Sequence, residues 1–491
     1  MQYFSTRDTS RRVSASRAIA DGLSPDGGLY VPSEFPQVSE AKLASLLKMD
    51  YRARAAYIMG LYLDEFSAEE IDALTSAAYG DQFRNKDIAP LRILDDDTAV
   101  LELWHGPTCA FKDMALQMLP HLLTASLAKC GETRDVCILT ATSGDTGKAA
   151  LEGFCDVPRT RIVVFYPVDG VSRIQKLQMT TQKGGNVLVS GVEGNFDDAQ
   201  SGVKAIFGDK ALAERLNEKG VFLSSANSMN WGRLLPQVVY YFSAYCDFVN
   251  AGKIRLGDIL DFCVPTGNFG DILAGWIAGQ MGLPVGRYLC ASNANNVLTD
   301  FIQTGVYDRN RPFHTTISPS MDILISSNLE RLLYFLSGSE TEVCGYMKAL
   351  AECGRYSVSE RVNAGIKKDF LGGFCDDEQT KQTIEHYFRK YSYLADTHTA
   401  VALHVLQETR REEGEKHPCI VLSTASPYKF AGDVLAALGG RAEAEAALDA
   451  LSETTGTPVP DPLAGIAEKP IRFNGCVRQE EMLALVEQYL S

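Results

Sequence analysis

The chain has 491 residues, of which 45% are hydrophobic and 22% are charged, a composition typical of globular proteins and unlike that of disordered or fibrous chains. The net charge of −15 argues against nucleic acid and anionic membrane as partners, because both would be repelled. At about 150 residues per domain, the length predicts about three domains.

The first residues lack the continuous apolar stretch of a secretory signal, and no later stretch approaches the ~20 apolar residues of a membrane span. The twelve cysteines are scattered and form no CxxC pair, and no HExxH motif is present. We therefore expect a cytoplasmic protein with reduced cysteines and without a metal site.

Residues 1–94 are predicted to form a small N-terminal domain. The segment 24–32, SPDGGLYVP, contains the Asp-Gly and Gly-Gly pairs of a tight turn. Helices are predicted over residues 40–47 and 68–78. Ser39 is a candidate cap for the first, and Ser67 with Glu70 has the spacing of a capping box at the start of the second.

From residue 95 onward, short apolar runs alternate with longer amphipathic ones. This order predicts right-handed crossovers and parallel sheets covered by helices on both faces, divided between two α/β domains at 95–225 and 226–491. Ligands in such folds bind in the loops at the carboxyl ends of the strands. The predicted strands are 99–103, 136–140, 161–166, 186–189, 262–265, 287–291 and 419–423, and helices are predicted to begin near Phe111, Gly147, Phe196, Gly232, Gly270 and Lys429.

The first of four candidate loops is HGPTCAFKD, residues 105–113, which precedes a helix predicted to continue through Ala125. Lys112 lies in the first turn of that helix, where the positive end of the helix dipole disfavours a protonated amine. Partial burial would further lower its pKa from about 10.4 and favour imine chemistry. The alternative is an ordinary solvated lysine.

The second loop is TATSGDTGK, residues 140–148, which places hydroxyls and small residues between a strand and a helix. Such a loop can bind an anion through side-chain hydroxyls and backbone N–H groups. It is not a nucleotide-binding P-loop, because Thr142 stands where the first glycine is required and Ala149 replaces the magnesium-binding hydroxyl. An ordinary capped loop remains the alternative.

The third loop, PTGNFGD over residues 265–271, has two glycines that let the backbone approach a phosphate at the start of a helix. The fourth, STASP over residues 423–427, offers a hydroxyl that can hydrogen-bond a neutral heteroaromatic nitrogen. A tight turn and a capping hydroxyl are the respective alternatives. Together the four loops supply an amine, an anion-binding loop, a phosphate cup and a ring-nitrogen partner, which are the parts of a pyridoxal phosphate site.

Many motifs along the chain, in order and spacing, resemble those of the threonine synthase family in its long bacterial and fungal form. They are YFSTRD, GLSPDGGLYVP, HGPTCAFKDMALQ, ATSGDTG, EGNFDDAQ, SANSMNWGRLLPQ, PTGNFGDILAG, SMDILISSNLERLL, DTHTAVA and STASPYKF. The resemblance covers nearly the whole chain. It implies the tryptophan-synthase-β-like α/β fold, with two parallel-sheet domains and a small N-terminal domain, and pyridoxal 5'-phosphate as cofactor.

The resemblance also implies roles for individual residues. Lys112 would hold the cofactor as a Schiff base, and Thr424 would face its ring nitrogen. Around the cofactor phosphate would lie Gly267, Asn268, Phe269, Gly270 and Asp271. Near the substrate carboxylate and the cofactor's 3′ oxygen would lie Thr142, Ser143, Asp145 and Thr146.

The segment GVSRIQKLQMTT, residues 170–181, departs from the family pattern, since Arg173 and Lys176 replace a proline and an acidic residue. Either residue, or Arg233, is a candidate to bind the substrate phosphate, with solvation on a helix face as the alternative. The implied reaction converts O-phospho-L-homoserine and water to L-threonine and phosphate, in a monomer or homodimer. The rival functions are a phospholyase that yields 2-oxobutyrate and a catalytically dead scaffold.

Overall fold

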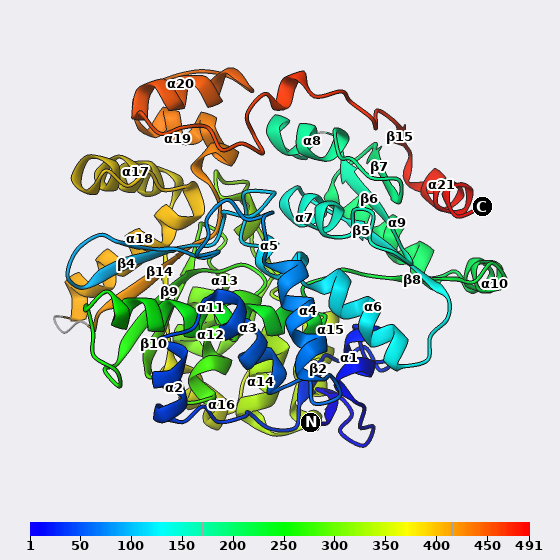
Figure 1. Cartoon of the computed structure of the whole chain (residues 1–491), viewed down its shortest axis with the longest axis horizontal. Coiled ribbons are helices and arrows are strands. Elements are labelled where there is room, and N and C mark those ends of the chain that lie inside the picture. The colour runs from blue at the N-terminus through cyan, green and yellow to red at the C-terminus, as the bar shows by residue number, and fades with distance from the viewer. Residues whose placement is uncertain (169, 414–416) are drawn as a thin grey trace.

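The computed structural model describes residues 1–168, 170–413 and 417–491 and is built around two parallel sheets (Figure 1). In the larger sheet all neighbouring strands are parallel except β3 and β4. Its strand order is β13 (Phe370–Phe374), β10 (Val285–Ser292), β9 (Leu260–Pro265), β14 (Cys419–Ser423), β4 (Thr98–Glu102) and β3 (Leu91–Ile93).

The smaller sheet is parallel throughout. Its order is β15 (Cys476–Val477), β7 (Val187–Val192), β6 (Thr160–Pro167), β5 (Asp135–Ala141) and β8 (Val221–Ser224). Each of the seven predicted strands coincides with an observed strand, so the predicted α/β fold with parallel sheets is confirmed. Strands of a parallel sheet are buried on both faces, so each of them is a short continuous apolar run that can be located in the sequence.

The N-terminal residues form an antiparallel pair, β1 (Tyr3–Ser5) with β2 (Tyr30–Pro32), and four helices. These are α1 (Ala15–Asp21), α2 (Glu40–Leu46), α3 (Tyr51–Gly60) and α4 (Ala68–Ala78). Both predicted helix starts are confirmed. The Ser39 side chain accepts a hydrogen bond from Lys42 N, and Ser67 and Glu70 form a complete capping box.

The helix predicted from Phe111 through Ala125 is wrong as a single element, because the chain forms two helices there. A short α5 (Asp113–Leu116) ends before α6 (Leu119–Lys129) begins. Pro120 lies in the first turn of α6, where its missing N–H is tolerated, but it could not continue a helix arriving from upstream. The break leaves Lys112 at the start of a helix of only four residues.

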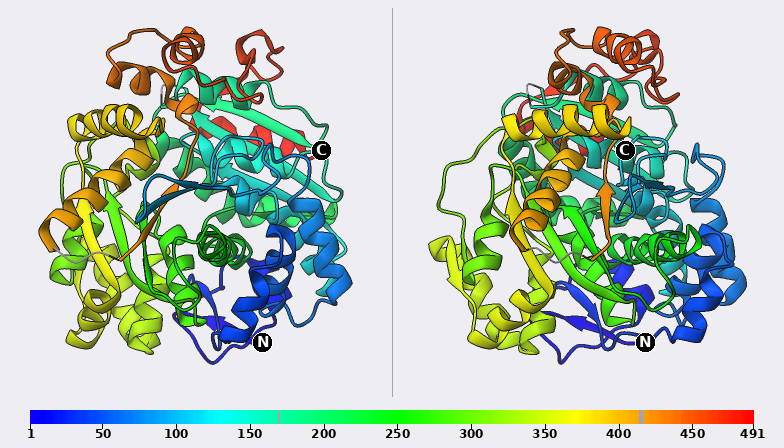
Figure 2. Two further views of the ribbon diagram at one scale, coloured as in Figure 1. Left: turned by 60° about the vertical axis from the view of Figure 1, so that its left-hand side comes forward. Right: turned by 90° about the vertical axis from the view of Figure 1, so that its left-hand side faces the viewer.

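The remaining helices cover the two sheets (Figures 1 and 2). Next to the smaller sheet are α7 (Asp145–Gly153), α8 (Arg173–Thr180), α9 (Phe196–Gly208), α10 (Lys210–Glu218) and α21 (Met482–Tyr489). With the larger sheet are α11 (Trp231–Asn250), α12 (Gly270–Gln280), α13 (Val297–Thr304), α16 (Glu360–Asp369) and α18 (Thr397–Glu413). Further out are α14 (Leu329–Ser337), α15 (Glu340–Cys353), α17 (Asp377–Tyr391), α19 (Ala431–Ala437), α20 (Ala446–Thr455) and the pair β11 (Val306–Asp308) and β12 (Arg355–Ser357).

Three strands cross the domain limits expected from the sequence. β3, from the 1–94 segment, pairs with β4 in the larger sheet. β4, from the 95–225 segment, pairs in the larger sheet, and β15, from the 226–491 segment, pairs in the smaller one. The division at residues 94 and 225 therefore stays a prediction. α5 lies between the two sheets in Figure 1, so the segment that carries Lys112 is placed where the sheets meet.

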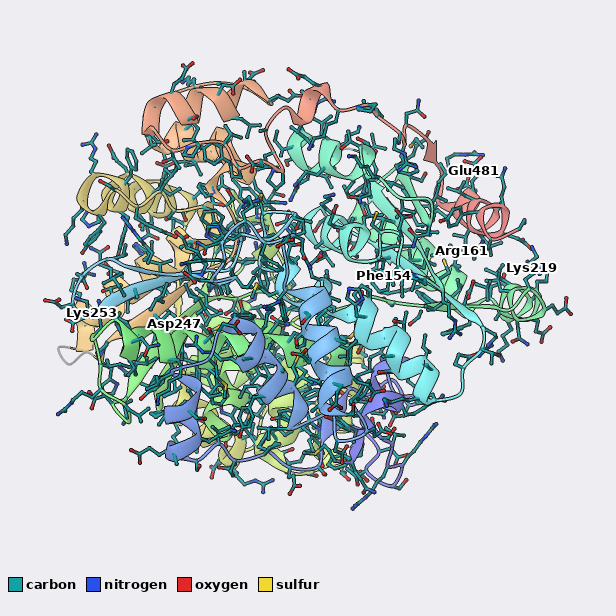
Figure 3. All side chains as sticks on the ribbon, viewed as in Figure 1. Phe154, Arg161, Lys219, Asp247, Lys253 and Glu481 are labelled. Atoms are coloured by element: carbon teal, nitrogen blue, oxygen red, sulfur yellow. The ribbon has the colours of Figure 1, made fainter. Side chains whose placement is uncertain are left out.

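Most large apolar side chains lie in the interior and most charged side chains lie at the surface (Figure 3). Phe154 is fully buried at the end of α7, whereas Lys219 and Glu481 are exposed at the periphery. All twelve cysteines are free thiols. Within the described residues, none of the helices combines the length and apolar character needed to cross a membrane.

Candidate active site

The Lys112 loop and the loop after β14 lie side by side because β4 and β14 are parallel neighbours. Phe111 N donates a hydrogen bond to Thr424 O at 2.8 Å, and Ser426 N donates to Cys109 O at 3.0 Å. Two of the four predicted loops are thus joined by backbone hydrogen bonds, with Lys112 one residue from the contact.

A buried carboxylate holds the Lys112 loop in shape. Asp113 accepts hydrogen bonds from Thr108 N at 2.8 Å and from Thr108 Oγ1 at 2.7 Å. Gly106 is required beside it, since a Cβ there would lie 2.5 Å from Asp113 Oδ2. Cys109 has a φ of 61°, in the left-handed region that only a few non-glycine residues occupy. The loop is therefore tightly constrained around the lysine.

Lys112 forms the N-cap of α5, and its ammonium lies 4.8 Å from the Phe111 ring centroid. Burial lowers its pKa, and the charges of Arg233 and Lys429 lower it further. Asp145 and Asp271 act in the opposite direction. In the described part of the chain, Lys112 Nζ has neither a hydrogen bond nor an ion pair. A partly buried amine with a lowered pKa and no fixed partner is suited to nucleophilic chemistry.

The loop after β5 is ordered by Thr142, whose Oγ1 accepts hydrogen bonds from Gly144 N at 3.0 Å and Gly147 N at 2.9 Å. The Thr142 hydroxyl is therefore occupied by its own loop. Ser143 is exposed and Thr146 is partly exposed, and neither side chain forms a hydrogen bond within the described residues. These two hydroxyls remain available to a ligand.

Asp145 is the first residue of α7 and is buried. Its Oδ1 lies 2.9 Å from Lys429 Nζ and accepts a hydrogen bond from Gln175 Nε2 at 2.8 Å. Burial alone would raise the pKa of Asp145. The cations Lys429 and Lys112 outweigh that effect and hold the pKa below its usual value. Asp145 is therefore a carboxylate at neutral pH.

Lys429 is a functional candidate that the sequence did not reveal. A helix start was predicted near it, but lysines at helix starts are usually solvated. In the structure it is fully buried in the turn Pro427–Phe430. The only signal was its position within STASPYKF, directly after a candidate site loop.

The third loop forms a cup at the start of α12. Phe269 has a φ of 61°, and Gly270 opens the helix. Gly267 is closely packed, because a Cβ there would lie 2.9 Å from Ser320 O. The loop carbonyls are held from outside by Ser326 Oγ, 2.7 Å from Gly267 O, and by Asn328 N, 3.1 Å from Asn268 O. Asn268 is exposed, so the cup opens to solvent.

Asp271 turns toward α11 rather than into the cup. Its Oδ1 accepts hydrogen bonds from Tyr240 at 2.5 Å and Tyr241 at 2.9 Å. Burial raises its pKa to about 6, and Oδ2 is buried without a hydrogen-bond partner in the described structure. Because its pKa is raised, Asp271 takes up a proton more readily, and the neutral carboxylic acid does not repel a phosphate as the carboxylate would.

Thr424 and Ser423 are both buried at the end of β14, but their hydroxyls differ. Ser423 Oγ accepts hydrogen bonds from the side chains of Trp104 at 3.0 Å, Tyr393 at 3.2 Å and Thr399 at 3.0 Å. The Thr424 hydroxyl has no such partner among the described residues. Thr424 is thus the hydroxyl that remains free to meet a ligand.

The three cationic candidates are placed very differently. Arg233, in the first turn of α11, is buried; Nη1 donates to Ala226 O at 2.8 Å, while Nε has no partner in the described structure. Burial lowers its pKa to about 10. Arg173 has a side chain 54% exposed and pairs with Glu445 at 2.9 Å, and Lys176 is partly buried with its amine 6.0 Å from the Tyr166 ring centroid. Of the three, Arg233 is the one whose charge is among the largest influences on the pKa of Lys112.

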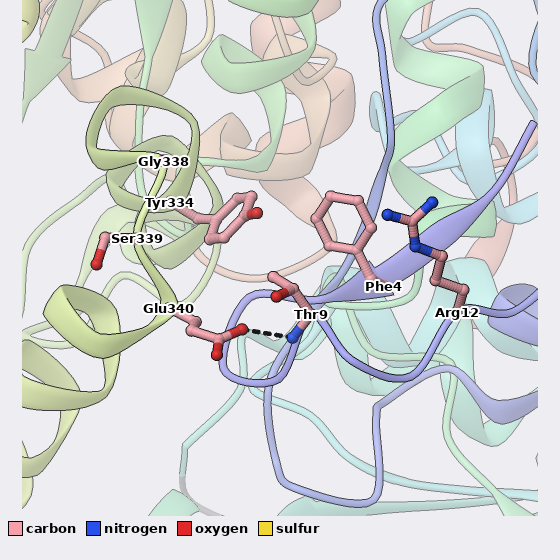
Figure 4. A pocket seen from close by; sticks show the side chains of 7 residues that line it. All are labelled: Phe4, Thr9, Arg12, Tyr334, Gly338, Ser339 and Glu340. Carbon is pink, nitrogen blue, oxygen red and sulfur yellow. Dashed lines mark hydrogen bonds between the residues drawn. The ribbon is translucent and has the colours of Figure 1, made fainter.

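Two surface cavities are lined by residues outside the four loops, although Ser326, in the second cavity, bonds Gly267 of the third loop. One is lined by Phe4, Thr9, Arg12, Tyr334, Gly338, Ser339 and Glu340, with Thr9 N donating to Glu340 (Figure 4). The other, of about 660 Å³, lies between the N-terminal residues and α15 and includes Ser326 at its edge. Neither cavity contains Lys112, Asp145 or Thr424.

Comparison with known proteins agrees with the resemblance. Residues 2–79 match the family model "Threonine synthase N terminus", and residues 399–489 match "Threonine synthase, C-terminal". A threonine synthase of Pseudomonas aeruginosa is 40% identical over 435 residues, which cover 88% of this chain and 89% of that protein.

The human protein "Threonine synthase-like 1" is 40% identical over 445 residues, but this chain spans only 59% of its length. A crystal structure of PLP-bound threonine synthase from Brucella melitensis superposes with a TM-score of 0.89 at 37% identity, covering 100% of this chain and 98% of that one. High identity over nearly the full length of bacterial relatives excludes a chance match. The chain therefore belongs to the threonine synthase family.

Proposed function

We propose that this protein is a pyridoxal-phosphate-dependent lyase that converts O-phospho-L-homoserine and water to L-threonine and phosphate. Phosphate would leave from the γ-carbon and water would add at the β-carbon, so a small molecule is the expected partner. The observation that carries the proposal is the Lys112 amine, which has a lowered pKa and no hydrogen bond among the described residues, in a loop whose backbone is bonded to that of Thr424.

The residues fit pyridoxal phosphate by the chemistry of their donors. Lys112 would hold the cofactor covalently through Nζ, and the free Thr424 hydroxyl would donate to a neutral ring nitrogen. The cup at residues 267–270 offers backbone N–H groups and the positive end of α12 to the phosphate. Asp271 would contribute to the cup through its backbone, because its side chain turns toward α11, and Asp145 would lie near the 3′ oxygen.

When bound, pyridoxal phosphate supplies an electron sink for charge that develops at the substrate α-carbon. The protein's part is to move protons and to orient the substrate. Lys112 Nζ, with its pKa lowered, can accept the α-proton and return it. The available hydroxyls of Ser143 and Thr146 can orient the substrate carboxylate and an attacking water.

Among the cations, Arg233 is best suited to bind an anionic group of the substrate, because its buried Nε lacks a partner in the described structure. We propose Arg173 and Lys176 as weaker candidates for the substrate phosphate, since Arg173 is engaged with Glu445. Thr142 would shape the loop and contact substrate only through its backbone.

Covalent attachment can be tested by borohydride reduction of the purified, cofactor-loaded protein followed by peptide mapping. The cofactor should be fixed to Lys112. Lys112→Ala should keep its circular dichroism spectrum but lose turnover by at least about 10³-fold, because the attachment point and the proton acceptor disappear together. Mapping of the adduct to another lysine would overturn the assignment.

The reaction itself can be tested with O-phospho-L-homoserine in ¹⁸O-enriched water. The label should appear in the threonine hydroxyl, with one phosphate released per threonine. Phosphate release accompanied mainly by 2-oxobutyrate would instead identify a phospholyase on the same scaffold. Loading with cofactor but no phosphate release would indicate a catalytically inactive homologue.

A further inference from the structure

We propose that Lys429 is a positioning residue that holds Asp145 through its Oδ1 and thereby prevents Asp145 from forming an ion pair with the Lys112 amine. The inference rests on the proposed function, in which Lys112 must present an uncharged amine. It assigns a task to a fully buried cation that the proposed mechanism does not otherwise use.

The contacts of Lys429 satisfy its ammonium completely. Nζ lies 2.9 Å from Asp145 Oδ1, 2.9 Å from Gln178 Oε1 and 3.1 Å from Thr108 O. An ammonium has three protons, and each has an acceptor here. The acceptors come from α7, α8 and the Lys112 loop. Lys429, in the turn after β14, therefore joins these three segments to one another.

Asp145 is fixed on one oxygen only. Oδ1 accepts from both Lys429 and Gln175, whereas Oδ2 has no hydrogen bond in the described structure. Without Lys429, Asp145 would be a buried carboxylate lacking its cation, and Lys112 is the other cation that acts on it. A buried carboxylate without a partner is strongly unfavourable, so Asp145 would pair with Lys112.

The four charged groups with the largest effects on Lys112 are consistent with this assignment. Asp145 from α7 and Asp271 from α12 favour the charged lysine, and Arg233 from α11 with Lys429 opposes it. The two tyrosines that bond Asp271 Oδ1 remain when Lys429 is replaced, so Asp145 is the carboxylate that loses a partner. Asp113, on α5, is bonded to Thr108, and the charge of Lys429 acts on it as well.

The test measures the pKa of the Lys112 amine in the full-length chain before cofactor is added. Competitive acetylation with acetic anhydride across pH 6–11, followed by peptide mass spectrometry, gives the titration of Lys112 alone. The variants are Lys429→Met, Lys429→Arg, Asp145→Asn and the double variant Lys429→Met/Asp145→Asn. Lys148→Met is the matched control, because Lys148 is also buried and paired with an acid, Glu152 at 2.7 Å.

Lys429→Met should raise the pKa of Lys112 by about one unit or more, since it removes an opposing cation and releases an anion. Asp145→Asn should lower it, and the double variant should return it to near the original value. Lys429→Arg should preserve the original titration, and Lys148→Met should leave it unchanged. A purely structural Lys429 would not produce this pattern of signs.

An unchanged Lys112 titration in folded Lys429→Met, or a double variant that stays as high as the single one, would overturn the proposal. If Lys429→Met does not fold, Lys429→Gln, which can still donate to Thr108 O, takes its place. Loss of fold in both would assign Lys429 to the fold alone and reject the positioning role. Because the labelling needs neither cofactor nor substrate, its failure is distinguishable from failure of the borohydride and product tests.

Discussion

Asp113 is fully buried next to Lys112, and it accepts both of its hydrogen bonds from a single residue, Thr108. Burial outweighs these hydrogen bonds and raises the pKa of Asp113 to about 6, against 3.8 without the fold. The folded protein therefore binds this proton more tightly than the unfolded chain. The stability associated with it is full below about pH 4 and is lost as the pH rises through 6.

This sign predicts the behaviour of Asp113→Asn, which keeps an acceptor for Thr108 N but cannot ionise. Relative to the variant, the original protein should lose up to about 3 kcal/mol of unfolding free energy between pH 4 and pH 7, at 1.36 kcal/mol per pKa unit. Urea denaturation of both proteins at pH 4.5, 5.5 and 7 measures the difference. A difference that stays constant across these pH values would show that Asp113 does not titrate with the fold.

Thr424 provides a second prediction for a single side chain. Thr424→Asp would place an anion where the free hydroxyl now lies, and an anion favours the protonated form of a ring nitrogen. The absorption spectrum of the bound cofactor and the ratio of threonine to 2-oxobutyrate should both change. Thr424→Ser, which retains a hydroxyl, should leave both close to the original. Unchanged spectra in Thr424→Asp would remove this residue from the site.

The places of the four candidate loops could be predicted because each follows a strand, whereas the roles of their residues stay predictions. Lys112, Thr424 and the loops at residues 142–146 and 267–271 could be predicted, since apolar runs mark where parallel strands end. Lys429 could not, because its burial depends on acceptors from three segments distant in the sequence. The orientation of Asp271 toward Tyr240 likewise depends on how α11 packs.

At the scale of elements, the strands were easier to predict than the helices. A buried parallel strand is a short apolar run, which the sequence shows directly. The break between α5 and α6 was missed because the hydrophobic pattern continues through it, and only Pro120 marks the change. How closely two helices pack can depend on a single glycine at their contact, and such a glycine does not change the hydrophobic pattern of the sequence.

Gly153 shows this at the contact between α5 and α7. A Cβ at Gly153 would lie 1.9 Å from the backbone oxygen of Leu116, so the two helices could not keep their distance. Gly153→Ala should therefore destabilise the protein by about 2–4 kcal/mol, in the range of strongly overpacked core sites. Because Lys112 is the N-cap of α5, the variant should also weaken cofactor retention.

Gly345 is the matched control, since it lies within α15, is exposed and has no atom within 4 Å of the place that a Cβ would take. Gly345→Ala should stabilise the protein by about 0.5–1 kcal/mol through helix propensity alone. Thermal unfolding of the two variants should thus shift in opposite directions. A Gly153→Ala protein as stable as the original would show that α5 and α7 can separate without cost.

At the scale of the whole molecule, the sequence does not predict which sheet each strand joins. Local patterns give strands but not their partners, and β15 joins the smaller sheet from a position nearly 300 residues beyond β7. Its two residues and α21 complete the edge of that sheet. The C-terminal segment therefore belongs physically with the sheet that carries the Asp145 loop.

Removing residues 476–491 should consequently destabilise the smaller sheet. Met482 and Val486 on α21 and Leu490 at its C-cap are buried. Met482 packs so closely on α9 that a Cβ at Gly202 would lie 2.3 Å from its sulfur. At about 1.5–3 kcal/mol for each fully buried side chain, their loss amounts to several kcal/mol. The deletion also removes the pairing of β15 with Gly191 and Val192, so that β7, still paired with β6 on its other side, becomes the edge strand there.

The truncated protein should therefore unfold at lower temperature, bind more of a hydrophobic dye and aggregate more readily through the β7 edge. Met482→Ala separates the two causes, because it removes the contact with α9 but keeps the pairing of β15 with β7. It should lower thermal stability by an amount typical of a core methionine, about 2–5 kcal/mol, without promoting aggregation. Equal aggregation of both variants would show that the exposed helix face, and not the free strand edge, drives association.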